Sequence, residues 1–213
     1  MDFKELANHV IEGNAQGAAK WTDEALAQKV KANDIINRGL MPGMSEVGRR
    51  FKGGEYYLPE VIISARAMKA VMAKIEPLLV KSGAPRTGRV VIGTVQGDLH
   101  DIGKNLVGMM LEGSGFEIHD LGTDVTPDKF AQAAKKKKAD LVCLSALLTT
   151  TMPVMKSTIQ ALNTAGVRKQ VKVMVGGAPV TQNYADEIGA DGFAPDAASA
   201  VDKARFLMDI GAR

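Results

Sequence analysis

Beyond residue 88, short apolar segments alternate with segments of helical character, and this alternation limits the possible folds more than any other feature of the chain. The strand-like segments cover residues 89–95, 116–121, 139–147, 171–175 and 192–194. The helical segments cover 102–113, begin again at Pro127, Pro153 and Thr181, and end with one at the C-terminus. Such β-α units predict a doubly wound, five-stranded parallel sheet of the flavodoxin-like or Rossmann-like kind.

The first 81 residues have another pattern, which predicts an all-α part. We expect helices over 2–12, from an N-cap at Thr22 to Gly39, from Pro42 to Gly53, and from Pro59 onward. The short connections favour an antiparallel four-helix bundle, with Trp21, Met68 and Met72 in its core. Glycine, proline and serine mark residues 82–88 as a linker. The predicted parts are therefore a helical domain over 1–81, a linker over 82–88 and an α/β domain over 89–213.

Composition and charge exclude several classes of protein. Of the 213 residues, 46% are hydrophobic and 24% are charged, as in ordinary globular proteins. No apolar run approaches the roughly 18 residues that span a bilayer, so we expect no membrane partner. The net charge of +3 is spread along the chain and does not favour nucleic acid, and the run 135–138 is typical of a solvated helix end. With one cysteine and no signal-peptide core, the chain is expected to be cytoplasmic.

The loop after the first predicted strand contains Asp98-x-His100-x-x-Gly103. It is not a phosphate loop, because the glycine spacing is one residue too long and Asn105 stands where such a loop needs Ser or Thr. In an extended segment, residues i and i+2 point the same way. Asp98 can then accept a proton from one ring nitrogen of His100 and leave the other as a metal ligand or base. The alternative is a plain strand-to-helix turn with Asp98 or Asp101 as N-cap.

Two further loops follow predicted strands at the same edge of the sheet, where doubly wound proteins bind ligands. Residues 145–151 contain Ser145 and a cluster of threonines, which exceeds what capping of the helix at Pro153 requires. The other loop contains Gly176-Gly177, which permits either close approach to a ligand or a tight turn.

Asp98-x-His100-x-x-Gly103, Ser145-x-Leu147 and Gly176-Gly177, in this order, resemble the cobalamin-binding domain of methionine synthase and its relatives. Residues 51–61, which read FKGGEYYLPEV and run into SARAM at 64–68, resemble the helical cap domain of that family. The resemblance covers nearly the whole chain. In size, the chain is most similar to the stand-alone corrinoid proteins of methylamine, methanol and methoxy-aromatic methyltransferase systems.

The resemblance implies roles for individual residues. His100 would be the lower axial ligand of cobalt, in place of the cofactor's own base, and Asp98 would hydrogen-bond that histidine. Thr151 matches a third, hydroxyl member of this relay, a position where serine is common. Phe51 and Leu58 match cap residues over the upper face of the corrin. The other implied cofactor contacts are Asp101, Ile102, Gly103, Ser145, Leu147, Thr149, Gly176 and Gly177.

The resemblance also implies a function, that of a methyl carrier rather than an enzyme on its own. Bound cobalamin, or a related corrinoid, would cycle between Co(I) and the Co(III) of methylcobalamin. A donor-specific methyltransferase would load the methyl group, and a second methyltransferase would pass it to tetrahydrofolate or coenzyme M. A reductive activase is a further expected partner, and the 82–88 linker is the expected hinge for opening the cap.

Other classes of protein share parts of this pattern. A cobalamin-dependent sensor would need a DNA-binding module, and no basic helix-turn-helix stretch fits in this sequence. A cofactor-binding subunit of an adenosylcobalamin mutase would not need the helical cap. A phosphorelay receiver would need an aspartate at the end of the third strand, where Ser145 stands.

Overall fold

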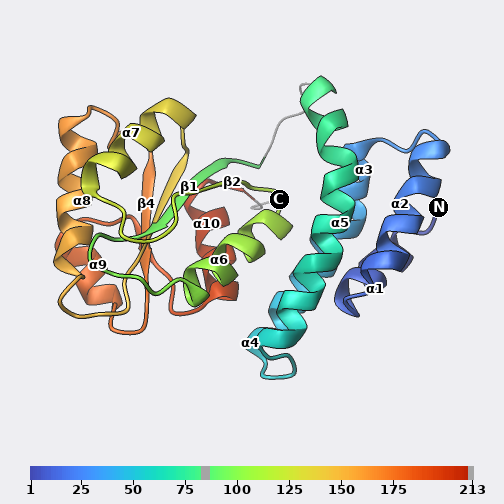
Figure 1. The fold of residues 1–213 in the computed structure, drawn as a ribbon, viewed down its shortest axis with the longest axis horizontal. Helices are drawn as coiled ribbons and strands as arrows, with labels where there is room; N and C mark the ends of the chain where they lie inside the picture. The colour runs from blue at the N-terminus through green and yellow to red at the C-terminus, as the bar shows by residue number, and fades with distance from the viewer. Residues whose placement is uncertain (83–86, 211–213) are drawn as a thin grey trace. The chain divides into compact units, whose positions relative to one another are not determined.

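The structure is a computed structural model that describes residues 1–82 and 87–210 (Figure 1). The described chain divides into two compact units. The first consists of the helices before residue 83 together with Gly113–Gly115, and the second contains the rest. The predicted linker over 82–88 includes residues 83–86, which lie outside the described residues.

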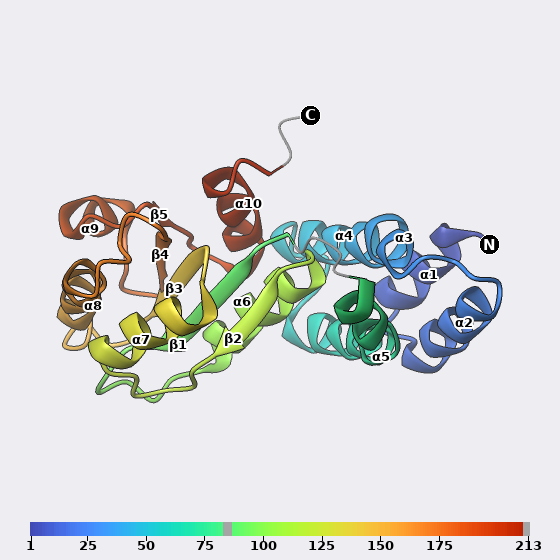
Figure 2. The same ribbon diagram turned by 90° about the horizontal axis from the view of Figure 1, so that it is seen from above.

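The first unit is helical throughout, as the sequence predicts. Its elements are α1 (Phe3–Ile11), α2 (Ala15–Ala27), α3 (Ala32–Ile35), the π-helical turn η1 (Ile36–Leu40), α4 (Met41–Lys52) and α5 (Leu58–Ser82). Because α3, η1 and α4 follow one another without a break, the unit has the expected bundle of four rods (Figure 2).

The predicted helix from Thr22 to Gly39 is wrong at both ends. It is also interrupted, because α2 ends at Ala27 and α3 begins at Ala32. The predicted helix start at Pro42 is also wrong, since the helical run from α3 through η1 to α4 continues across it.

Thr22 is not an N-cap: it lies buried inside α2, where its hydroxyl donates to the carbonyl of Ala18, and Asn14 caps the helix instead. Gly39 does not end a helix either. A Cβ atom there would lie 2.5 Å from Cδ2 of Leu6, so the glycine lets α1 pack closely against η1. The π turn directly precedes Pro42, which has no backbone N–H for a regular α-helical bond.

The core of this unit lies between α1, α2, α4 and α5. Trp21 and Met68 are both buried there, as predicted, whereas Met72 is only half-buried. The Trp21 ring packs against Phe3 at a centroid distance of 5.5 Å. The other large side chains in this core are Leu6, Val10, Ile35, Leu40, Met44 and Ile75. Burial of such apolar surface supplies most of the free energy that holds the helices together.

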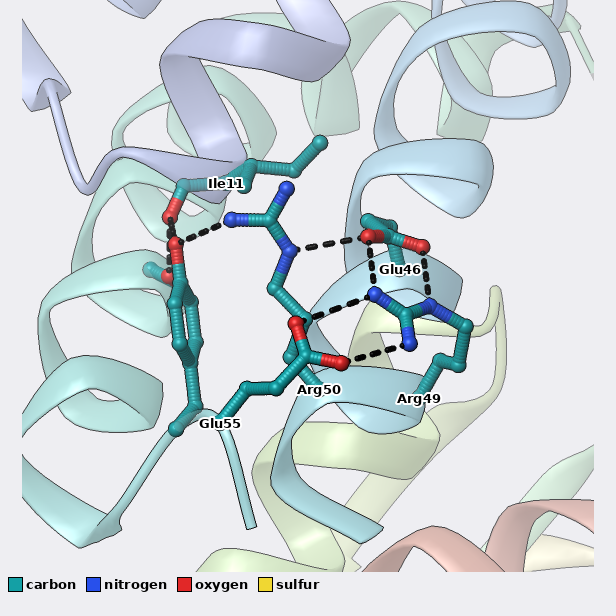
Figure 3. A network of polar contacts seen from close by, with 7 residues as sticks. Ile11, Glu46, Arg49, Arg50 and Glu55 are labelled. Atoms are coloured by element: carbon teal, nitrogen blue, oxygen red, sulfur yellow. Dashed lines mark hydrogen bonds and ion pairs between the residues drawn. The ribbon is translucent and has the colours of Figure 1, made fainter. Parts of the chain in front are cut away.

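A polar network links the end of α4 to the loop that precedes α5 (Figure 3). Both Arg49 and Arg50 donate to the carboxylate of Glu46 at 2.8 Å. Arg49 also donates to Glu55 at 2.8 Å, and Arg50 donates to the hydroxyl of Tyr56 at 3.0 Å. The Tyr56 hydroxyl in turn donates to the carbonyl of Ile11, at the end of α1. The loop is therefore fixed to α1 and α4.

The second unit is a parallel sheet with helices on both faces. Its strands are β1 (Arg89–Thr94), β2 (Glu117–Asp120), β3 (Leu141–Ser145), β4 (Lys172–Gly176) and β5 (Gly192–Phe193). Its helices are α6 (Ile102–Gly113), α7 (Pro127–Lys137), α8 (Pro153–Thr164), α9 (Gln182–Ile188) and α10 (Ala197–Leu207). This confirms the predicted fold class.

The strand order is β2-β1-β3-β4-β5, with every pair parallel. Helices α7, α8 and α9 cover one face of the sheet, and α6 and α10 cover the other (Figure 1). Side chains of α7 to α9, among them Phe130, Met155 and Ile159, form one core cluster with Val91, Val142 and Val173 of the strands. No helix within the described ranges is long and apolar enough to cross a bilayer.

The network around Glu46 predicts a dependence of stability on pH. Hydrogen bonds from Arg49 and then Arg50 lower the pKa of Glu46 from 4.5 to about 2. A depressed pKa means that the folded state favours the ionised carboxylate, so its stabilisation is present above pH 4.5 and is lost as the pH falls towards 2. Glu46→Gln should therefore lower the thermal midpoint at neutral pH, and its deficit relative to wild type should shrink through this window.

Glu5→Gln, which changes an exposed acid in the first turn of α1, serves as the control. A deficit of Glu46→Gln that stays constant as the pH falls would contradict a role for the ionised carboxylate.

Candidate cofactor-binding site

The candidate site lies where the strand order changes direction. The chain runs from β1 outward to β2 and then returns to β3 on the other side of β1. Thr94 and Ser145, the last residues of β1 and β3, are paired in register, so the loops that follow these strands start side by side. Loops at such a switch point form the usual ligand site of a doubly wound sheet.

Asp98 is fully buried and accepts hydrogen bonds from both of these loops. Its Oδ1 atom lies 2.7 Å from Nδ1 of His100 and also accepts the backbone N–H of His100. Its Oδ2 atom accepts the backbone N–H groups of Leu147 at 2.8 Å and Leu148 at 3.2 Å. The hydroxyl of Thr151 donates to the same oxygen at 2.9 Å. The carboxylate thus joins the loop after β1 to the loop after β3.

These contacts keep Asp98 ionised. Burial alone raises the pKa of its carboxyl, but the hydrogen bonds from His100, Leu147 and Thr151 outweigh burial and hold the pKa well below its usual range. An ionised carboxylate can only accept hydrogen bonds, so Nδ1 of His100 must carry the proton between the two residues. In a neutral imidazole, the lone pair is then on Nε2.

His100 itself reaches the surface, because 53% of its side chain is exposed. Its backbone is held from the other side as well, since the hydroxyl of the buried Thr94 donates to its carbonyl at 2.8 Å. The backbone and Nδ1 of His100 are therefore held in place while Nε2 stays accessible, as a metal-binding histidine requires.

The hydroxyl of Thr151 has two acceptors within reach. Asp98 Oδ2 and the carbonyl of Leu148 both lie 2.9 Å from its Oγ1 atom. Thr151 is buried, with 7% of its surface exposed. Of the threonines singled out in this loop, Thr151 is the one that contacts the carboxylate, while Thr149 is exposed.

Four apolar side chains in or next to the two loops that Asp98 joins are left open to solvent. Two of them, Ile102 and Leu147, are predicted site residues and are 69% and 43% exposed. Leu99 and Leu148, at 73% and 40%, are not among the predicted residues. The sequence could have indicated them only by their positions, since Leu99 precedes His100 and Leu148 follows Leu147. Exposed apolar side chains in loops at the carboxyl ends of strands indicate a surface that an apolar ligand covers.

The remaining predicted residues lie on the adjacent strand ends. Ser145 ends β3 and pairs with Gly176, which ends β4. Gly177 has a φ of +127°, and a Cβ atom there would lie 1.8 Å from the carbonyl oxygen of Ala146. Only glycine permits this approach between the two loops, so the pair Gly176-Gly177 has a structural role at this edge.

The start of α6 leaves room for a large group. Asp101 accepts from the side chain of Asn105 at 3.1 Å, and Gly103 lies exposed in the first turn. A Cβ atom on Gly103 would meet nothing within 4 Å. This open space, the exposed leucines and the Nε2 atom of His100 fit a flat, largely apolar metal macrocycle. Phe51 and Leu58 belong to the helical unit and are half-buried there, so the site built in the sheet unit does not include them.

Comparisons with known proteins agree with this geometry. A family model described as a B12 binding domain matches residues 88–203, and a second model with the same description matches residues 2–76. The chain is 45% identical over 211 residues to a dimethylamine corrinoid protein of Methanosarcina barkeri, covering 97% of both. It is 44% identical over 206 residues to a trimethylamine corrinoid protein of Methanosarcina mazei, covering 96% of this chain and 94% of that one.

Among solved structures, the chain is similar to one in the methanol:cobalamin methyltransferase complex from Methanosarcina barkeri. The TM-score is 0.85 at 30% sequence identity, and the match covers 97% of this chain and 79% of the other.

The contacts of Asp98 predict a contrast between two variants of the ligand-free protein. Asp98→Asn turns an acceptor into a donor facing buried N–H groups, so it should lower the free energy of unfolding by about 2–4 kcal/mol. His100→Ala removes a half-exposed ring and should cost less than about 1 kcal/mol. Urea unfolding measures both, and equal losses would contradict the anchoring role of Asp98.

Proposed function

This chain belongs to the B12-binding corrinoid proteins, and we propose that it carries methyl groups in a methylamine methyltransferase system, with cobalt held by His100. Members of this family are subunits of methyltransferase systems and not catalysts alone. The observation that carries the proposed ligation is the 2.7 Å contact between Asp98 and Nδ1 of His100, which leaves Nε2 for the metal.

The bound corrinoid supplies a cobalt centre that accepts a methyl group and gives it up again. The protein's part is to hold that centre and adjust its lower ligand. In this assignment Nε2 of His100 would hold the cobalt, and Asp98 would accept the hydrogen bond from Nδ1–H. The buried carboxylate of Asp98 would keep the ring in this orientation and increase the electron donation of Nε2 to a bound metal. The hydroxyl of Thr151 supports the same carboxylate.

The rest of the site holds the cofactor. Ile102, a cofactor contact implied by the resemblance, would offer apolar contact to the bound corrinoid together with the neighbouring Leu99 and Leu148. Gly103 would let α6 approach the nucleotide tail, and Asp101 would be a further cofactor contact. Ser145, Leu147 and Thr149 would line the pocket for that tail, with Gly176 and Gly177 on its other wall. Each of these assignments follows the family resemblance, supported by the exposure and spacing described above.

The helical unit, residues 1–81, is assigned the role of a cap over the upper face, with Phe51 and Leu58 as its contacts to the methyl group. In support, the network of Figure 3 fixes the loop between these two residues. An apolar cover slows oxidation and side reactions of the reduced centre.

The partners follow from the same assignment. Relatives named for dimethylamine and trimethylamine are 45% and 44% identical to this chain, against 30% for the methanol system. A methylamine-specific methyltransferase is therefore the proposed donor enzyme. The acceptor enzyme is a tetrahydrofolate or coenzyme M methyltransferase, a reductive activase restores oxidised cobalt, and the setting is the cytoplasm.

Electron paramagnetic resonance of the Co(II) form tests the ligation. With ¹⁵N-labelled histidine in the protein, the nitrogen splitting should change from that of the unlabelled protein, and it should vanish in His100→Ala. His9→Ala and His119→Ala are the controls and should keep it. A splitting that is insensitive to the label, or that survives in His100→Ala, would show that His100 is not the ligand.

The cap assignment predicts that Phe51→Ala shortens the lifetime of the reduced cofactor under a fixed exposure to oxygen, because the upper face loses its apolar cover. Absorption spectra follow the decay. Phe206→Ala, which removes a 75% exposed ring from α10, is the matched control. Equal lifetimes of the reduced cofactor in the two variants would show that Phe51 does not cover the cofactor.

The donor assignment predicts which purified methyltransferases methylate the loaded, reduced protein. Enzymes of the dimethylamine or trimethylamine systems should do so with their own substrates, as followed by absorption spectra, and the methanol enzyme should be much slower. Methylation by the methanol enzyme alone would overturn the methylamine assignment.

A further inference from the structure

The loop between β2 and α7 runs along the end of β1 instead of projecting into solvent. The backbone N–H of Thr94 donates to the carbonyl of Gly122 at 2.9 Å, and that of Val125 donates back to Thr94 at 3.0 Å. Val95 and Val125 form a parallel bridge beyond the named strands. These bonds fix residues 122–125 beside the turn that leads to His100.

Asp124 lies in this loop and contacts that turn twice. Its carboxylate Oδ1 accepts the backbone N–H of Gly97 at 2.8 Å. Its own backbone N–H donates to the carbonyl of Asp98 at 3.1 Å. The two bonds lie on either side of the Gly97–Asp98 segment and hold it as a clamp.

The backbone of Asp124 is unusual in a way that makes the clamp possible. Its φ is +54°, in the left-handed region that non-glycine residues rarely adopt. Aspartate and asparagine tolerate this conformation better than other side chains. A side chain that both tolerates it and accepts a hydrogen bond is therefore required here, although the residue is exposed and adds nothing to the core.

The position of the Gly97–Asp98 segment matters because Asp98 directs the imidazole. The Asp98 carboxylate is shared between His100 and the loop after β3, so a shift of its backbone changes the angle at which Nδ1 is held. Thr94 holds the carbonyl of His100 from the other end of the turn. Asp124 and Thr94 together enclose the segment between them.

We infer that Asp124 is a positioning residue for the axial ligand: it clamps the Gly97–Asp98 turn so that His100 presents Nε2 to cobalt in one orientation. The inference rests on the proposed function. It gives the β2–α7 loop a role in orienting His100, although Asp124 is 27 residues away from Gly97 in the sequence.

Two substitutions separate the carboxylate from the backbone. Asp124→Gly removes the acceptor while making the positive φ easier to adopt, so any loss is due to the side chain. Asp124→Asn keeps an oxygen acceptor and a residue that tolerates this φ, so it should restore the clamp. Lys138→Gly is the matched control, because Lys138 has a φ of +49° at the end of α7, away from the turn.

The first measurement is amide hydrogen exchange in the ligand-free protein. Asp124→Gly should exchange the Gly97 amide about tenfold faster than wild type, the effect of losing one hydrogen bond, and Asp124→Asn should not. The second is electron paramagnetic resonance of the Co(II) form. The ratio of His100-ligated to unligated cobalt should fall roughly three- to tenfold in Asp124→Gly and recover in Asp124→Asn.

The outcomes are distinguishable. If wild type itself shows no nitrogen coupling from His100, the proposed function fails. If wild type shows that coupling and Asp124→Gly keeps both the coupling and the slow exchange of Gly97, the positioning role of Asp124 is refuted. An equal change in Lys138→Gly also refutes it, because the effect would then belong to any left-handed position.

Discussion

A carboxylate buried at the end of β1 must have its charge met by donors, and this requirement organises the site. Asp98 has no exposed surface, and its donors come from its own loop and from the loop after β3. The same bonds that make burial tolerable also fix the proton on Nδ1 of His100. Folding of this edge of the sheet therefore also orients the imidazole, and the ligand-free protein already holds it in place.

The overall fold could be predicted from the sequence because its periodicities are strong. The apolar runs that became β1, β3 and β4 lie in the middle of a parallel sheet, covered on both faces, where no polar alternation is needed. The boundaries in the helical unit were harder. Thr22 followed by acidic residues is a typical helix start, yet packing buries it inside α2. Gly39 serves the approach of α1 to η1, a tertiary requirement that local rules cannot contain.

The candidate site could be predicted to a similar degree. The spacing of Asp98 and His100 indicates their contact, because two residues in an extended segment share a face. It does not indicate that the backbone N–H groups of Leu147 and Leu148 converge on the same carboxylate, since backbone donors leave no trace in residue identity. Asp124 was equally hidden. The role of Asp124 depends on the pairing of the β2–α7 loop with the end of β1. It also depends on the positive φ of Asp124, which is seen only in the folded chain.

The two acceptors of the Thr151 hydroxyl affect how strongly Nε2 of His100, the proposed cobalt ligand, can donate electrons. A hydroxyl has a single proton, and here it can point to Asp98 or to the carbonyl of Leu148, both 2.9 Å away. Rotation about one C–O bond therefore changes the number of donors on Asp98 without moving a heavy atom. When the proton points to Leu148, the carboxylate is more basic and pulls harder on Nδ1–H, which makes Nε2 a stronger electron donor. Serine at this position would offer the same choice, whereas alanine or valine would leave the carboxylate without this donor.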